Sequence, residues 1–218
     1  VSVLGGNTAN TEFEFLTGNT MAFLPQGSVA YQQYVKSNDY SIATYLKSKG
    51  YDTIAMHPYN ASGWDRDKVY PLLGFDTFYS LKDWVNPVKI RKYVSDQSCY
   101  DKIIELYEQK DANTPFFLFN VTMQNHSSYS EEYDNFHPDI TVEGTSSKIL
   151  PNYLSLIKLS DQALENLIEY FSQADEDTII VFFGDHQPSN SVAAPVWKIN
   201  GRSGDSLTEE EEALRYKV

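Results

Sequence analysis

The amino-acid sequence predicts an α/β fold with a mostly parallel central sheet flanked by helices. Residues 53–57, 115–123 and 178–183 are apolar runs rich in β-branched and aromatic side chains, and each is too short to cross a membrane. Segments with apolar residues at helical spacing lie between these runs. Buried strands that alternate with helices along the chain are typical of a parallel sheet.

Three segments show this helical spacing of apolar residues. Residues 38–49 carry apolar side chains on one face and end before Gly50, a residue that commonly terminates helices. Residues 100–109 and 152–173 show the same periodicity, and the second of these leads directly to the last apolar run. The polar residues 127–147 are expected to form a loop.

The length suits one domain with a sizeable core. Residues 1–4 at the start and 216–218 at the end are both strand-like. We therefore expect the fold to be incomplete at both ends.

Charge and cysteine content exclude several classes of protein. The chain has 17 Lys and Arg residues against 30 Asp and Glu residues, which gives a net charge of −13. A chain this acidic does not have nucleic acid as its main partner, and it does not adsorb to anionic lipid through charge alone. Its single cysteine, Cys99, excludes an internal disulfide and most thiolate metal sites.

Three of the four histidines lie at or just beyond the ends of predicted strands. These are His57, His126 and His186. Because the carboxyl ends of parallel strands meet at one edge of a sheet, the three rings are expected to converge on one cleft. His137 lies in the predicted loop, and we expect it at the surface.

A Gly-Asp-His sequence follows the last apolar run. A carboxylate and an imidazole, here Asp185 and His186, suit a divalent cation at the end of a strand. The same dipeptide would also fit a capping aspartate beside a packed histidine.

A glycine turn near the start leads into a predicted helix, and Thr8 lies at this junction. In one interpretation Thr8 is the N-cap and Glu12 lies in the first turn. In the other, the helix start binds a phosphate and Thr8 is the nucleophile beside it. A threonine hydroxyl needs a cation to stabilise its alkoxide, and Asp185 and His186 could hold that cation.

These motifs resemble the extracellular domain of lipoteichoic acid synthases and related phosphoglycerol transferases, in the sulfatase-like branch of the alkaline phosphatase superfamily. The matching segments are residues 6–13, His57, residues 63–67, 74–76, 125–126 and 184–188. The resemblance implies an alkaline phosphatase/sulfatase-like fold, with residues 1–218 forming part of one sulfatase-like catalytic domain. It also implies that an upstream strand with a metal-ligand glutamate, and further downstream strands, lie outside this chain.

The resemblance further implies roles for individual residues. Thr8 would be the catalytic nucleophile, and Thr8, Asp185 and His186 would bind one Mn²⁺ or Mg²⁺. Arg66 and His126 would act in catalysis.

The same resemblance assigns the substrate-binding residues. His57, Arg66 and His126 would contact the phosphate, the glycerol or the leaving oxygen, and Trp64 would shape the pocket. In this chain Tyr59 stands where the family often has an acidic residue, which alters the contacts expected for the glycerol.

The implied activity is metal-dependent transfer of phosphoglycerol from a phosphatidylglycerol-type lipid to an acceptor hydroxyl through a phospho-threonine intermediate. The implied setting is cell-envelope polymer synthesis at the extracellular face of a bacterial membrane. The partners would be an anionic phospholipid headgroup and a polymer or glycolipid acceptor, with the membrane reached through segments outside this chain.

Other functions fit the same motifs. A phosphoethanolamine transferase or a secreted phosphodiesterase would use the same residues, and a non-catalytic remnant could bind anionic glycans. Sulfatases mature a Cys or Ser that is followed by Pro and Arg at fixed spacing. The residues around Cys99 contain neither, which disfavours sulfate ester hydrolysis.

Overall fold

The structure, a computed structural model, describes residues 7–202 and 208–214. The strands are β1 (Asp52–His57), β2 (Thr77–Ser80), β3 (Lys89–Ile90), β4 (Tyr93–Val94) and β5 (Phe116–Asn120). The α-helices are α1 (Thr8–Thr17), α2 (Ala30–Gln33), α3 (Ile42–Lys47), α4 (Arg66–Leu72), α5 (Asp96–Gln109), α6 (Ile149–Ser172), α7 (Asn190–Ile199) and α8 (Glu209–Leu214). Short 3₁₀ turns span Met21–Phe23, Gly63–Asp65 and Leu81–Asp83.

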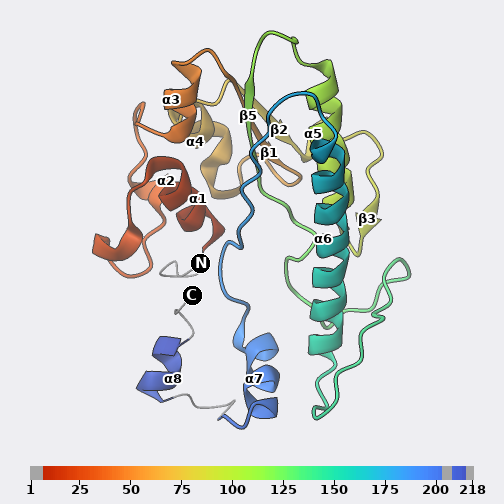
Figure 1. Cartoon of the computed structure of the whole chain (residues 1–218). Coiled ribbons are helices and arrows are strands. Elements are labelled where there is room, and N and C mark those ends of the chain that lie inside the picture. Colours follow the sequence, from red (N-terminus) through yellow and green to blue (C-terminus); the bar gives the residue numbers. More distant parts are fainter. Residues whose placement is uncertain (1–6, 203–207, 215–218) are drawn as a thin grey trace.

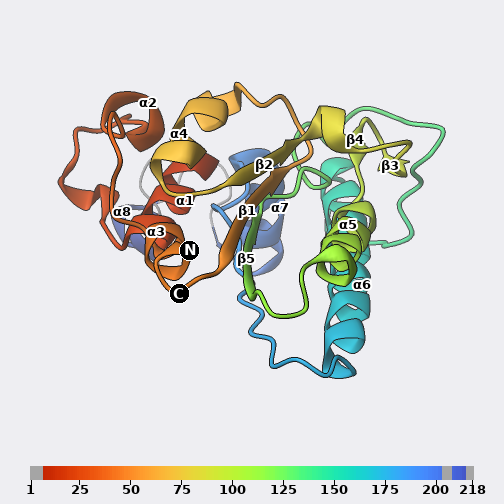
Figure 2. The same ribbon diagram turned by 90° about the horizontal axis from the view of Figure 1, so that it is seen from above.

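A parallel sheet lies between two groups of helices. Its three strands follow the order β2–β1–β5, and β3 and β4 form a separate antiparallel ribbon. Helices α1 to α4 lie on one side of the sheet, and α5 and α6 lie on the other (Figures 1 and 2). This arrangement confirms the predicted fold class.

The register of the sheet brings the ends of the strands to one edge. His57, the last residue of β1, pairs with Ser80 at the end of β2. Met56 pairs with Asn120 at the end of β5. The chain segments that leave these strands therefore start from neighbouring positions, as the sequence predicts for a parallel sheet.

Local capping signals explain where two helices begin. The Ser41 side chain accepts from the Thr44 backbone N–H, and Thr44 bonds back to the Ser41 backbone, which forms a reciprocal cap for α3. The Ser95 side chain accepts from the Ser98 N–H, so α5 begins before the predicted residue 100.

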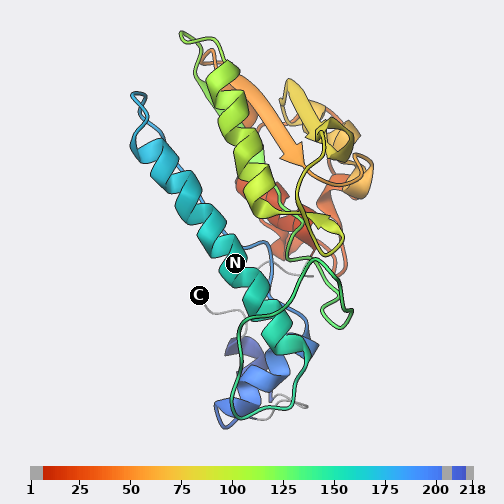
Figure 3. The same ribbon diagram turned by 90° about the vertical axis from the view of Figure 1, so that its right-hand side faces the viewer.

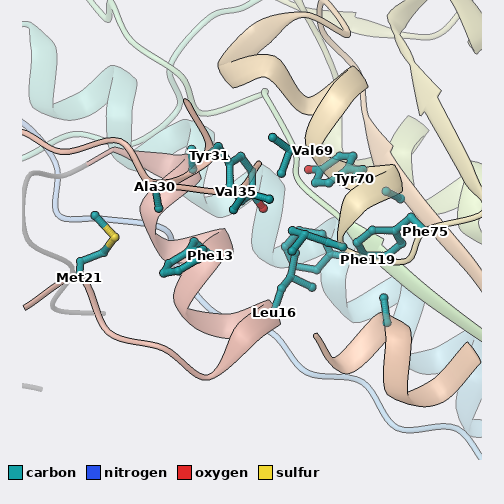
Figure 4. Packing of buried hydrophobic residues seen from close by; sticks show 14 residues of the cluster. Phe13, Leu16, Met21, Ala30, Tyr31, Val35, Val69, Tyr70, Phe75 and Phe119 are labelled. Carbon is teal, nitrogen blue, oxygen red and sulfur yellow. The ribbon is translucent and has the colours of Figure 1, made fainter. Parts of the chain in front are cut away.

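Two apolar clusters hold the helices to the sheet. In the first, α1, α2 and α4 pack with β1 and β5 through residues that include Phe13, Leu16, Tyr31, Tyr70 and Phe119 (Figure 4). In the second, α5 and α6 pack side by side (Figure 3) through Cys99, Tyr100, Ala163 and Leu167. Burial of Cys99 raises the pKa of its thiol, which suits a packing residue.

A glycine fixes the approach of α3 to the turn after α4. Gly74 has a φ of +91°, and a Cβ there would lie 2.5 Å from Thr44 Cγ2 and 2.8 Å from the Thr44 backbone nitrogen. Only glycine fits both the backbone angle and the space.

The prediction of a buried strand over residues 178–183 is wrong for the described chain. This segment contains neither strand nor helix, and Ile179, Val181 and Phe182 are 91%, 62% and 63% exposed. A strand needs a hydrogen-bonded neighbour along its length, and no described strand pairs with this one. Phe183 alone packs inward, with its ring 4.7 Å from that of Phe15.

Other predictions have mixed outcomes. Residues 127–147 form a loop containing one isolated bridge, and His137 is exposed, as predicted. The strand-like residues 1–4 and 216–218 lie outside the described residues. Among the residues that are described, no helix combines the length and apolar character needed to cross a bilayer.

Candidate active site

The predicted nucleophile and the predicted metal ligands are in contact. Thr8 is the first residue of α1, and its hydroxyl donates to Oδ2 of Asp185 at 2.6 Å. The same carboxylate oxygen lies 3.2 Å from Nε2 of His186. Thr11, one turn further along α1, donates its hydroxyl to the backbone oxygen of Asp185. The start of α1 therefore holds Asp185 by both its side chain and its backbone.

The helix start differs in one detail from the predicted cap. Asn7, not Thr8, is the N-cap, and its side chain makes no capping bond. The Thr8 hydroxyl is therefore free to bond across to Asp185 instead of capping its own helix.

The donor set around Asp185 fits a hard divalent cation. A hydroxyl, a carboxylate and an imidazole meet at one oxygen, and oxygen and nitrogen ligands suit Mn²⁺ or Mg²⁺. Thr8 is partly buried, while the side chains of Asp185 and His186 are 45% and 36% exposed. Within residues 7–202 and 208–214, no group of three or more His, Cys, Asp or Glu side chains forms a metal site. The candidate metal site therefore needs the Thr8 hydroxyl. Together with Asp185 and His186 it offers three ligands.

His57 is buried at the end of β1 in its neutral form. Its Nδ1 lies 2.9 Å from the backbone oxygen of Val121. Because a carbonyl can only accept, Nδ1 carries the proton and Nε2 is left as an acceptor. Burial, together with the positive charge of Arg66, lowers the pKa of His57 to about 4. At neutral pH this ring therefore accepts a hydrogen bond and cannot serve as an acid.

His126 is exposed on the loop that follows β5. Its Nδ1 lies 3.0 Å from the backbone oxygen of Ser127 and 3.3 Å from the Tyr93 hydroxyl. The ring packs edge-on against Tyr93, with 5.6 Å between centroids. Its Nε2 has no protein partner among the described residues and is therefore open to a ligand.

An arginine that sequence reasoning missed holds this loop in place. Arg91 is 4% exposed and donates to the backbone oxygens of Gln124, His126 and Ser128 at 2.7, 2.7 and 2.5 Å. Its guanidinium lies 5.5 Å from the centre of the Tyr129 ring. Arg91 itself has a left-handed φ of 55°, and no pattern in the sequence predicts this conformation or these contacts.

A strained turn places Trp64 and Arg66 next to each other. Trp64 and Asp65 both have left-handed backbone angles, with φ of 57° and 59°. Such angles cost a non-glycine residue roughly 1–2 kcal/mol each and concentrate at functional sites. Packing of Trp64 against the core and the Lys68–Asp65 ion pair hold the turn in this conformation.

Arg66 begins α4 and is paired with Glu12 of α1 inside the core. The two side chains are 2% and 3% exposed. Although burial favours the neutral acid, the Arg66 guanidinium holds the pKa of Glu12 below its usual value. Sequence reasoning places Glu12 only in the first turn of its helix, because no local pattern links residues that are 54 positions apart.

Aromatic rings connect the two histidines at the strand ends. Tyr59 lies 6.1 Å from the ring of His57 and 6.4 Å from that of Tyr93, which in turn contacts His126. A Cβ at Gly63 would lie 3.6 Å from Nη1 of Arg66 and 3.9 Å from Cδ1 of Tyr59. Tyr59, which stands at the position where the motif departs from the family, therefore faces the same space as Arg66.

The structure thus forms two neighbouring groups from the predicted residues. Thr8, Asp185 and His186 form the first. The second contains His57, His126, Trp64 and Arg66. The two share α1, which carries both Thr8 and the Glu12 partner of Arg66. Within the described residues no hydrogen bond or ring contact joins His186 to His57 or His126, because residues 178–183 before it are not in the sheet.

Comparison with known proteins identifies the family of this chain. The sulfatase family model matches residues 2–209. A protein of Rhizobium meliloti (strain 1021) described as a "Putative cyclic beta-1,2-glucan modification protein" is 39% identical over 84% of the chain and 29% of its own length. The lipoteichoic acid synthase of Staphylococcus aureus (strain USA300) is 27% identical over 83% of the chain and 28% of its own length.

A solved structure has the same fold. The Streptococcus pyogenes phosphoglycerol transferase GacH, in complex with sn-glycerol-1-phosphate, superposes with a TM-score of 0.68 at 28% identity. The match covers 87% of this chain and 52% of GacH. The chain therefore belongs to the sulfatase family, and lipoteichoic acid synthases and a phosphoglycerol transferase are among the proteins it resembles. It spans less than a third of the two relatives above and about half of the GacH structure.

Proposed function

We propose that this chain is the catalytic part of a phosphoglycerol transferase in cell-envelope polymer synthesis. The observation that carries the proposal is the Thr8 hydroxyl at the start of α1, 2.6 Å from Asp185. Support comes from the likeness to a phosphoglycerol transferase whose solved structure holds sn-glycerol-1-phosphate. In this proposal the 218 residues are part of a larger sulfatase-like catalytic domain at the extracellular face of a bacterial membrane.

Thr8 would attack the phosphorus of a phosphatidylglycerol-type headgroup. The bond from Thr8 Oγ1 to phosphorus forms as the bond from phosphorus to the diacylglycerol oxygen breaks, which leaves phosphoglycerol on the threonine. Asp185 Oδ2 accepts the hydrogen bond of the Thr8 hydroxyl and so stands where a proton acceptor is needed. In a second displacement, the oxygen of an acceptor hydroxyl would bond to phosphorus as the bond from phosphorus to Thr8 Oγ1 breaks, and the acceptor's proton would restore the threonine hydroxyl.

Thr8, Asp185 and His186 would hold the Mn²⁺ or Mg²⁺. When bound, the ion would lower the pKa of the Thr8 hydroxyl and offset the negative charge of the phosphate. A further acidic ligand from outside this chain would complete the set.

Arg66 and His57 would bind the headgroup. The planar guanidinium of Arg66 suits two oxygens of one phosphate. His57 is neutral with Nε2 unprotonated, so it would accept a hydrogen bond from a glycerol hydroxyl. Trp64, which is partly buried beside Arg66, would form a wall of the pocket.

In its doubly protonated form, His126 would give its Nε2 proton to the departing oxygen. Its Nδ1 is held by the Ser127 carbonyl and Tyr93, which directs Nε2 away from the loop. General acid catalysis by a positioned histidine contributes roughly 10²–10⁴-fold to a rate.

A glycan hydroxyl is a further acceptor that the names of two relatives support. The 39% identical Rhizobium meliloti relative is named for glucan modification, and a second relative from that organism, 29% identical, is the capsular polysaccharide biosynthesis protein RkpI. The half-exposed Tyr59 ring supplies a flat apolar surface at the pocket, where the family often has an acid. A glucan or capsular polysaccharide acceptor is therefore a second candidate beside a lipoteichoic acid chain.

The test is mass spectrometry of the protein after incubation with phosphatidylglycerol and Mn²⁺. We expect a phosphoglycerol adduct on Thr8 and release of diacylglycerol. Thr8→Ala should lose both at a stability cost of roughly 1 kcal/mol or less, and Thr8→Ser should retain some activity.

Thr17→Ala is the matched control, because Thr17 lies at the far end of the same helix and its hydroxyl bonds only to the Phe13 carbonyl and the Asn19 backbone N–H. It should leave the adduct unchanged. An adduct that persists in Thr8→Ala, or faster turnover of an aryl sulfate than of phosphatidylglycerol, contradicts the proposal.

A further inference from the structure

A charged pair lies inside the apolar core between α1 and α4. Nε of Arg66 donates to both carboxylate oxygens of Glu12 at 3.2 Å, and Nη2 donates to Oε1. The hydroxyl of Tyr70, whose buried ring is seen in Figure 4, donates to Oε2 at 2.8 Å. The carboxylate therefore occupies the side of the guanidinium formed by Nε and Nη2.

Stability alone does not account for this pair. Removing two charges from water costs about as much as their attraction returns, and apolar side chains of similar volume often stabilise a core equally well. Apolar contacts already join α1 to α4 through residues such as Phe13 and Val69 of the first cluster. Two more apolar side chains would therefore satisfy a purely structural requirement.

The pairing leaves part of the guanidinium unused. Arg66 has five N–H groups. Glu12 takes the Nε proton and one on Nη2, and the Gly63 backbone oxygen accepts from Nη1 at 3.2 Å. The bonds to Glu12 and Gly63 leave one N–H on each terminal nitrogen, and the Tyr70 hydroxyl lies close to the same guanidinium. Two such donors match two oxygens of a phosphate.

Glu12 also lies one helical turn beyond Thr8. Residues four apart on a helix lie on the same face, so Thr8 and Glu12 are carried by one rigid element. Through Glu12, the orientation of the Arg66 guanidinium is fixed to the helix that carries the Thr8 hydroxyl.

We infer that Glu12 is a positioning residue for the phosphate site. It takes one side of the Arg66 guanidinium, leaves the two terminal N–H groups for phosphate oxygens, and fixes them relative to Thr8. This inference rests on the proposed function, since it assigns Arg66 to the phosphate of that reaction.

The experiment measures binding of inorganic phosphate by calorimetry in the presence of Mn²⁺, with thermal unfolding of each variant as the check on folding. The variants are Glu12→Gln, Glu12→Asp, Arg66→Met, and Glu12→Gln combined with Arg66→Met. Tyr70→Phe is the matched control, because it removes one hydrogen bond to Glu12 and leaves the ion pair in place.

Glu12→Gln should weaken phosphate binding about tenfold or more, and Tyr70→Phe should change it less than about threefold. Glu12→Asp retains the charge that balances Arg66 and therefore the fold. It should bind phosphate with an affinity between those of the wild type and Glu12→Gln. When Arg66 is already Met, Glu12→Gln should cause no further loss, because Glu12 acts through Arg66.

Two results would overturn the inference. One is a folded Glu12→Gln or Glu12→Asp variant that binds phosphate as tightly as the wild type, and the other is an equal loss in the Arg66→Met background. Turnover of phosphatidylglycerol is measured separately on the wild type. Its absence would refute the proposed function, whereas the phosphate affinities decide the role of Glu12.

Discussion

Acidification should destabilise the protein through one buried histidine. His57 is 2% exposed, and its Nδ1 donates to the Val121 backbone oxygen at 2.9 Å. Burial and the nearby Arg66 charge lower its pKa from 6.5 to about 4 in the folded protein, although the Glu12 carboxylate opposes this shift. The perturbation is a change of pH from 7 to 5, applied to the wild type and to His57→Gln.

The sign of the effect follows from which state binds the proton first. The unfolded chain takes up a proton on His57 near pH 6.5, whereas the folded protein takes it up only near pH 4. Stability from this group is therefore lost as the pH falls through that window. At 1.36 kcal/mol per pKa unit the full loss is about 3 kcal/mol, of which about 2 kcal/mol occurs between pH 7 and 5.

Urea unfolding at pH 7, 6 and 5 measures this loss. The wild type should lose about 2 kcal/mol more than His57→Gln between pH 7 and 5, because other titrating groups are common to both proteins. His137→Gln is the control, since His137 is exposed and should leave the pH dependence unchanged. Parallel stability curves for the wild type and His57→Gln would show that the folded protein does not hold this ring neutral.

Three further changes test other parts of the structure. Arg91→Met should cost at least about 2 kcal/mol and speed amide hydrogen exchange in residues 124–128, because three carbonyls lose a charged donor. Lys92→Met, which removes an exposed ion pair, should cost much less than Arg91→Met, and equal costs would contradict the role of Arg91. Gly74→Ala should cost roughly 2–4 kcal/mol by urea unfolding, because of both its left-handed φ and its contact with Thr44. Gly50→Ala has a similar φ but open space, so a loss as large as that of Gly74→Ala would refute the steric argument. Mn²⁺ at 100 times its Kd should stabilise the wild type by about 2.7 kcal/mol in thermal unfolding, and an unchanged shift after Asp185→Ala with His186→Ala would refute the metal assignment.

The surroundings of the two histidines decide which of them can act as the acid in the proposed reaction. His57 has one protonation state at neutral pH, so an acid must come from elsewhere, and His126 is the exposed imidazole near it. Arg91 makes the position of His126 depend on a buried guanidinium, although neither the sequence motif nor the family resemblance includes Arg91.

Short-range signals in the sequence were sufficient for much of the fold. The apolar run at residues 53–57 corresponds to β1, and the run at 115–123 contains β5. The helix expected at 152–173 corresponds to the larger part of α6. These elements depend on periodicity and capping within about a dozen residues, which the sequence displays directly.

The run at residues 178–183 shows where such reasoning fails. Its composition is that of a strand, but a strand forms only when another strand supplies hydrogen bonds along its edge. No described strand does so, and Ile179 and Phe182 are exposed instead.

For the site, the sequence by itself determined which side chains are present and in which motifs, including Thr8, Arg66 and the Asp185-His186 pair. Only the tertiary structure decided what those side chains contact. It joined Thr8 to Asp185 across 177 positions and Arg66 to Glu12 across 54. The sequence does not show whether a carboxylate faces water or a buried guanidinium. Burial and pairing set its charge and its role, and both depend on parts of the chain that local pattern does not connect.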